Sequence, residues 1–98
     1  MENFDQDILL GSWQSMPEVD ELSREIFYRV EFYPGGILAF VTIKSNKAQI
    51  IKMSYRVDGD NIFTHQDGRT DREITKFSVS DNCLILIHGG MESKFFKV

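Results

Sequence analysis

Few residues in this 98-residue chain have the types and spacing that chemistry requires. His88-Gly89-Gly90 has the composition of an oxyanion-hole segment, but that use needs a parallel sheet and a Gly-x-Ser-x-Gly motif, which the sequence lacks. A hairpin turn after an apolar strand is the better interpretation. His65 and His88 could join a metal or haem, but their spacing forms no motif and indicates no third ligand.

The acidic and sulfur-bearing residues give no stronger signal. Asp58-Gly59-Asp60 begins like a calcium loop, but Ile62 and Phe63 occupy positions where oxygen ligands are required, so the segment is interpreted as a turn. Cys83, the single cysteine, begins an apolar strand and is expected to pack as a small hydrophobic residue. No carboxylate pair or nucleophile and base pairing stands out. We therefore expect no enzyme, no catalytic residue, no metal and no cofactor.

Composition restricts the partners and the compartment. The net charge is −4, with 11 basic residues scattered along the chain, so nucleic acid is not an expected partner. One cysteine cannot form an intramolecular disulfide. The first seven residues lack the basic region of a signal peptide, and no apolar run is long enough to span a bilayer. A cytoplasmic protein that does not bind membranes is expected.

Most of the chain alternates apolar and polar residues with a period of two, which predicts short strands separated by turns. Residues 4–10 fit one or two helical turns with Gly11 as the stop. Residues 18–23 are predicted to form a loop. No length remains for crossover helices, so the expected fold is an all-β, eight-stranded, up-and-down antiparallel barrel whose first strand pairs with its last. The expected strands are 12–16, 25–33, 37–44, 48–57, 62–66, 74–79, 83–88 and 91–97.

The turn Pro34-Gly35-Gly36 sets the register of the clearest hairpin. Proline fixes a negative φ, which favours a type I turn followed by Gly36 as a left-handed bulge. A register one residue out of step would turn the opposite set of side chains inward. The bulged register puts three pairs on the inner face: Phe32 opposite Leu38, Val30 opposite Phe40, and Tyr28 opposite Thr42.

This register leaves an aliphatic row on the outer face of the second strand of the hairpin. A contiguous apolar row facing water is unusual, so we expect it to be covered and to form an interface. The cover is either the N-terminal turn with Phe4, Ile8 and Leu9, or a second copy in a symmetric homodimer, since dimers are the commonest oligomers. The predicted interface residues are Ile37, Ala39, Val41 and Ile43.

The inner face is the candidate ligand site. An eight-stranded barrel is just wide enough to be filled by side chains or to hold one small ligand. Aromatic, thioether and hydroxyl groups suit a small apolar molecule with one polar handle, and they suit a closed core equally well. The predicted lining residues are Tyr28, Phe40, Thr42, Met53, Tyr55, Phe77 and Leu86.

Short segments of the chain resemble a known family. Gly11-Ser12-Trp13 at the start of the first strand resembles the Gly-x-Trp segment of lipocalins and the wider calycin group. Residues 32–40 and 55–62 are similar to hairpin segments of small bacterial lipocalin-like domains. The resemblance implies a single lipocalin-like barrel over residues 1–98, with Gly11 and Trp13 structural and with Lys94 or Lys97 packed on the tryptophan. The chain departs from secreted lipocalins in its shortness and in lacking a disulfide pair.

Two functions follow from these predictions. The first is a non-catalytic barrel that binds one small hydrophobic ligand in its interior. The second is an interaction module, an inhibitor or a self-associating barrel, that uses its outer face and has a filled interior.

Overall fold

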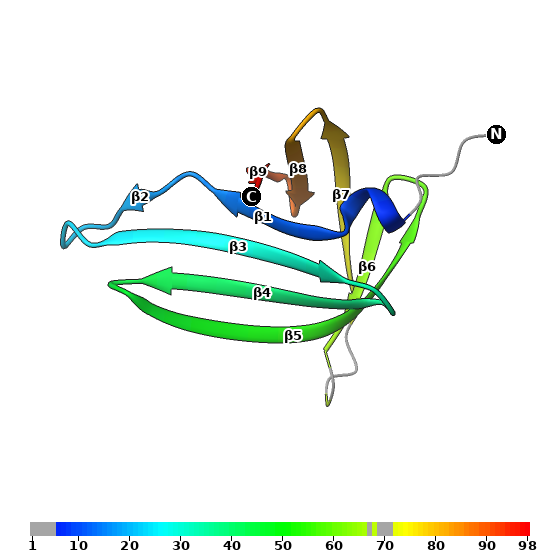
Figure 1. The fold of residues 1–98 in the computed structure, drawn as a ribbon, viewed down its shortest axis with the longest axis horizontal. Helices are drawn as coiled ribbons and strands as arrows, with labels where there is room; N and C mark the ends of the chain where they lie inside the picture. The colour runs from blue at the N-terminus through cyan, green and yellow to red at the C-terminus, as the bar shows by residue number, and fades with distance from the viewer. Residues whose placement is uncertain (1–5, 67, 69–71) are drawn as a thin grey trace.

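The computed structural model describes residues 6–66, 68 and 72–98, which form an all-β chain (Figure 1). No α-helix occurs among these residues, and the N-terminal turn is a four-residue 3-10 helix, η1. Phe4, expected in a helical turn, lies outside the described residues. The elements are η1 (Gln6–Leu9), β1 (Gly11–Ser15), β2 (Glu18–Val19), β3 (Glu25–Tyr33), β4 (Ile37–Lys44), β5 (Lys47–Asp58), β6 (Asn61–His65), β7 (Arg72–Ser80), β8 (Cys83–His88) and β9 (Met91–Lys97).

Eight antiparallel strands close into a barrel, as predicted. From β3 to β9 each strand pairs with the next, and β1 closes the ring because it pairs with β9 on one side and with β3 on the other. The prediction of a loop over residues 18–23 is wrong at its start, because β2 pairs with the beginning of β3 as an extra strand. Figure 1 shows β3, β4 and β5 running on past the shorter strands towards the end of the molecule that carries β2.

The predicted register of the β3–β4 hairpin is confirmed. Phe32 lies opposite Leu38, and the two other predicted inner pairs are also formed. The predicted type I turn is wrong, because Gly35 has a φ of +89° as well as Gly36 at +79°, and a type I turn needs a negative φ at both central positions. Loop length, not turn type, sets the pairing, and three residues separate Tyr33 from Ile37 in either case.

The barrel end at which β1 starts is filled by a core that we call the plug. Trp13 is 2% exposed, and its Nε1 donates a hydrogen bond of 2.9 Å to the carbonyl of Leu9. Lys97 Nζ lies 4.6 Å from the centroid of the Trp13 ring and donates to the carbonyl of Leu10. Of the two candidate lysines it is therefore Lys97 that packs on the tryptophan. The plug consists of Leu9, Trp13, Phe32, Tyr55, Ile62, Phe77, Leu84 and Phe95.

The β4 row, which was expected to need a cover, is buried at its centre within the single chain. Ala39 and Val41 are only 2% and 6% exposed, whereas Ile37 at the end of the row is 43% exposed. Val41 lies between Arg29 of β3 and Ile50 of β5, and directly opposed residues on antiparallel strands stand side by side. These larger side chains shield the row within a single chain.

Leu9 of the N-terminal turn does not cover the β4 row. Leu9 is fully buried in the plug, where its carbonyl accepts the indole hydrogen bond, and Ile8 is 42% exposed. The residues that shield the row therefore come from the neighbouring strands of the same sheet.

We predict that Lys97→Ala lowers the free energy of unfolding by about 1–2 kcal/mol, because it removes both the cation–π contact and the hydrogen bond to Leu10. The matched control is Lys94→Ala on the same strand, which changes the same charge away from Trp13 and should cost less than about 0.5 kcal/mol. Urea unfolding followed by Trp13 fluorescence measures both values. Equal effects of the two substitutions would contradict the assignment.

Candidate functional site

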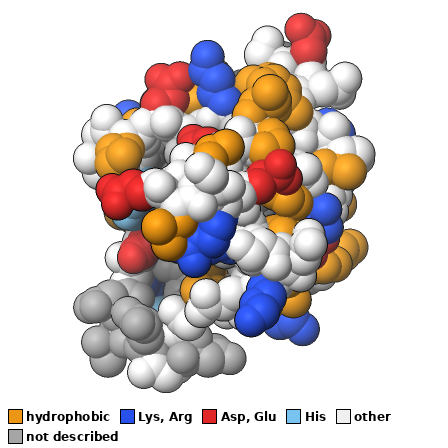
Figure 2. All heavy atoms as spheres, turned by 90° about the vertical axis from the view of Figure 1, so that its left-hand side faces the viewer, with side chains coloured by type: hydrophobic (Ala, Val, Ile, Leu, Met, Phe, Trp, Pro, Cys, Tyr) orange, Lys and Arg blue, Asp and Glu red, His pale blue; other side chains and the backbone are white. Residues whose placement is uncertain are grey.

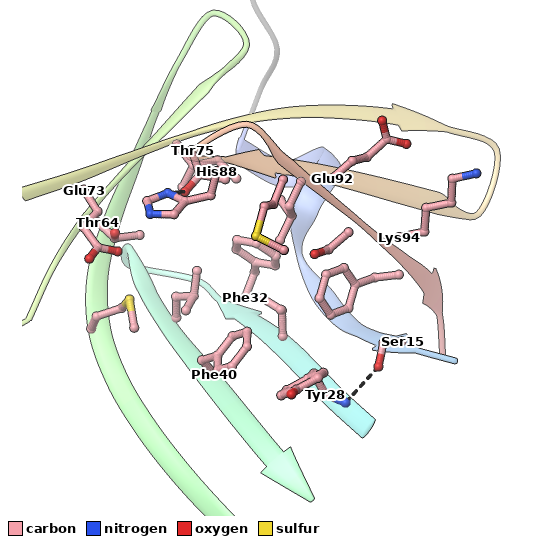
Figure 3. Close-up of a pocket in the computed structure, with 18 of the residues that line it drawn as sticks. Ser15, Tyr28, Phe32, Phe40, Thr64, Glu73, Thr75, His88, Glu92 and Lys94 are labelled. Atoms are coloured by element: carbon pink, nitrogen blue, oxygen red, sulfur yellow. Dashed lines mark hydrogen bonds between the residues drawn. The ribbon is translucent and has the colours of Figure 1, made fainter. Parts of the chain in front are cut away.

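A cavity of about 740 Å³ enters the barrel from the end opposite the plug, and we call it the cup (Figure 3). Its floor is apolar because each strand directs every second side chain inward, and those residues are mostly aromatic or aliphatic. Side chains thus fill the barrel at the plug and leave the cup open at the other end. The apolar residues of the cup are Val30, Phe32, Leu38, Ile62 and Phe95 near the plug, with Tyr28, Phe40, Met53, Leu86 and Met91 nearer the mouth.

The predicted lining divides between the cup and the plug. Tyr28, Phe40, Met53 and Leu86 line the cup. Tyr55 and Phe77 face inward as predicted but are 5% and 4% exposed in the plug.

Thr42 lies opposite Tyr28, but it is not among the residues that line the cup. Thr42 pairs with Gln49 of β5, and this part of β5 lies before Ser54, where the pairing of β5 with β6 begins. The wall of the barrel is incomplete at this point, which explains why an inward-facing residue lies outside the cavity.

Polar side chains gather along one side of the cup, and we call them the polar arc: Thr64 of β6, Glu73 and Thr75 of β7, and His88 of β8. Glu73 lies directly opposite Thr64 across the β6–β7 pairing. Thr75 Oγ1 and His88 Nδ1 are hydrogen-bonded at 3.2 Å. Figure 3 shows the four side chains on neighbouring strands, across the cavity from Tyr28.

The polar arc was not identified from the sequence as part of the barrel lining, although the alternation of residues along β7 and β8 indicates it. Every second residue of a strand faces the same side, so the inward direction of Phe77 implies that Thr75 and Glu73 also face inward. On the next strand, the inward direction of Leu86 implies the same for His88. From the sequence, His88 was weighed as a ligand together with His65 and as the end of a strand before a turn, but it was not placed in the lining of the barrel.

The two histidines do not converge. His88 lines the cup, whereas His65 follows Thr64 on the strand and faces the outer side of the barrel. Among the described residues no group of three His, Cys, Asp or Glu side chains is placed to hold a metal ion.

The mouth of the cup is acidic. Glu18, Glu73 and Glu92 border the cavity, and Lys94 is the one lysine beside them among its lining residues. Lys94 pairs with Ile85 on the outer face of β9, and Figure 3 shows Glu92 and Lys94 directed away from the polar arc. Glu73 is therefore the charged group that faces the interior. At the end of the molecule that carries β2, hydrophobic side chains are exposed among both acidic and basic ones (Figure 2).

The loop between β2 and β3 is held by Asp20. Its Oδ1 accepts hydrogen bonds from the backbone N–H groups of Arg24 (2.8 Å) and Leu22 (2.9 Å), and its Oδ2 accepts from Arg24 Nε (2.8 Å). The bond from the Arg24 N–H is the main cause that holds the pKa of Asp20 at about 2, below its usual 3.8. This loop follows β2, whose Glu18 borders the cup.

We predict that Asp20→Asn changes the pH dependence of stability in a defined window. A carboxyl whose folded pKa is lowered stabilises the fold above the unfolded pKa near 3.8, and this contribution disappears as the pH falls through about 2. The difference in urea midpoint between the natural chain and Asp20→Asn should stay constant from pH 7 to pH 5 and narrow between pH 4 and pH 2. Glu21→Gln removes a charge from the same loop without touching these hydrogen bonds and is the control. A difference that does not change with pH would contradict the prediction.

Comparison with protein-family models, curated proteins and solved structures finds no match to this chain. No helix within the described part of the chain is long and apolar enough to cross a membrane. The geometry of the barrel and its cup is therefore the basis on which function is inferred.

Proposed function

We propose that this barrel is a non-catalytic, lipocalin-like binding protein that holds one small amphipathic molecule in the cup. The observation that carries the proposal is a cavity of about 740 Å³ with an apolar floor and polar groups on one side only. Ligand sites typically measure about 300–1,000 Å³ and combine apolar walls with a few placed polar groups. The closed barrel, and Lys97 packed on the tryptophan of Gly11-Ser12-Trp13, are further support for the lipocalin-like assignment.

The polar arc indicates which end of the ligand is polar and what charge it carries. The Thr64 and Thr75 hydroxyls can donate or accept hydrogen bonds, whereas the Glu73 carboxylate accepts hydrogen bonds but donates none. An anionic head group, as in a fatty acid, would meet this carboxylate and the two others at the mouth. A neutral or cationic head group that donates hydrogen bonds fits better, with its apolar body directed towards Val30 and Leu38.

The proposal predicts that filling the cup prevents binding. Leu86→Trp places a larger ring in the cavity and should weaken the binding of a neutral naphthylamine dye at least about tenfold. The matched control is Ile87→Trp, the next residue on β8, whose side chain is 40% exposed on the outer face. It should change the affinity less than about twofold.

Dye fluorescence, excited outside the tryptophan band, measures this affinity, and circular dichroism checks that both variants fold. Native mass spectrometry of the natural chain with the dye should show one bound molecule per barrel. A natural chain that binds no member of a panel of apolar and amphipathic probes would overturn the proposal, as would equal weakening by the two tryptophans.

The charge of the head group is tested separately. Glu73→Gln should weaken the binding of dodecyltrimethylammonium by about fivefold, equivalent to about 1 kcal/mol, and leave the neutral dye unchanged. Asp81→Asn removes the same charge from the β7–β8 turn, outside the lining of the cup, and as the control should change neither by more than about twofold. Dodecanoate should bind more weakly than the ammonium probe at low salt, with the difference shrinking as ionic strength rises. The opposite order would contradict a cation-selective mouth.

A further inference from the structure

Among the residues that the structure describes, the first half of β5 has a neighbouring strand on one side only. Strand β5 is 12 residues long, but its pairing with β6 begins only at Ser54. Before that point its only partner within residues 6–66, 68 and 72–98 is β4, and we call residues 47–53 the open edge. All the residues from Lys47 to Lys52 are exposed, with Ile50 at 58% and Ile51 at 37%.

The backbone groups that point out of this edge can be assigned. The Tyr55 N–H donates a 2.8 Å hydrogen bond to the Gly36 carbonyl, so odd-numbered residues of β5 direct their N–H and C=O groups towards β4. The register with β4 is continuous from Ser54 back to Lys47, so this alternation holds along the open edge. The even-numbered residues Ala48, Ile50 and Lys52 therefore direct both backbone groups away from the chain.

The open edge lacks the features that usually prevent pairing with another strand. Natural edge strands are protected by proline, by bulges or by charged side chains at their centre. Residues 47–53 contain no proline, the continuous register with β4 excludes a bulge, and the two lysines lie towards the ends. The centre is Gln49, Ile50 and Ile51.

We propose that the open edge binds the same edge of a second copy of this chain, forming a two-fold symmetric dimer with a continuous sheet. With Ile50 on the axis, Ile50 faces its own copy, and Ala48 faces Lys52 in both directions. All three outward-pointing residues then form hydrogen-bonded pairs. Each lysine of the edge lies opposite an uncharged residue, Lys52 opposite Ala48 and Lys47 opposite Met53.

Neighbouring registers are worse for identifiable reasons. A shift of two residues in one direction would place Ala48 opposite Ser54, which already pairs with His65 of β6. A shift in the other direction would place Lys52 opposite Asn46, a turn residue with a φ of +64°. The self-complementarity of one register is what identifies the partner as a second copy rather than another strand.

Side-chain packing supports the same register. Ile50 points to the outer face beside Val41, which is buried. Across the axis, the exposed Ile50 side chain would meet its copy and extend this apolar surface into the second chain. The available surface thus lies one strand beyond the row that the sequence had indicated.

Sedimentation equilibrium and amide exchange test the proposal. The natural chain should dimerise with rising concentration, and Ile50→Pro should remain monomeric, because the N–H that proline removes is not used within the chain. Ile50→Lys should also be monomeric, since it places two ammonium groups on the axis. The control is Ile74→Lys on β7, an equally exposed isoleucine at 55%, which should still dimerise.

Amide exchange of the natural chain gives a result that does not depend on any variant folding. The N–H groups of Ala48, Ile50 and Lys52 should gain protection as the concentration rises, whereas those of Gln49 and Ile51 should be protected at every concentration. A natural chain that stays monomeric at millimolar concentration would overturn the proposal. A dimer that persists in Ile50→Pro, or whose formation leaves the even-numbered amides unprotected, would do so as well.

Discussion

The packing of Trp13 at the point where β1 closes the barrel is the contact on which the rest of the structure depends. Strand β1 has five residues, yet it pairs with both β3 and β9. Trp13 lies opposite Val30 on one side and Lys97 on the other. The next residue, Gln14, also pairs with both strands, so these two residues join the two edges. Its indole bond to Leu9 brings η1 into the same contact. Without this packing β3 and β9 would both be free edges.

Closure at one end explains why the cup opens at the other. The large side chains Trp13, Phe32, Tyr55, Phe77 and Phe95 all gather in the plug, and the ring of Phe32 meets that of Tyr55 edge to face at 5.2 Å. Beyond the plug the strands differ in length, because β6 has five residues and β8 six, while β5 has 12. Short strands cannot wall the full length of the long ones. The cup and the open edge of β5 therefore have one cause.

The sequence predicted strand positions and one register well because both depend on local rules. Alternation has a fixed period, and the loop Pro34-Gly35-Gly36 has a fixed length, so β3 and β4 were bounded correctly. No such local rule gives the position of an inward-facing side chain along the barrel axis. Tyr28 and Tyr55 both alternate inward, but one lines the cup and the other the plug, because depth depends on how far each strand is displaced relative to its neighbours.

Burial on the outer face was hard to predict for a related reason. The alternation marks Val41 as outward, and a small aliphatic residue facing outward is expected to be exposed. Its burial depends on the size of the side chains opposite it, Arg29 and Ile50, which only the three-strand register identifies. Strand β5 carries the two proposals on its opposite faces: Met53 faces the cup, whereas Ile50 faces outward at the edge. Because the backbone separates these side chains, occupation of the cup and association through the edge do not compete for the same surface.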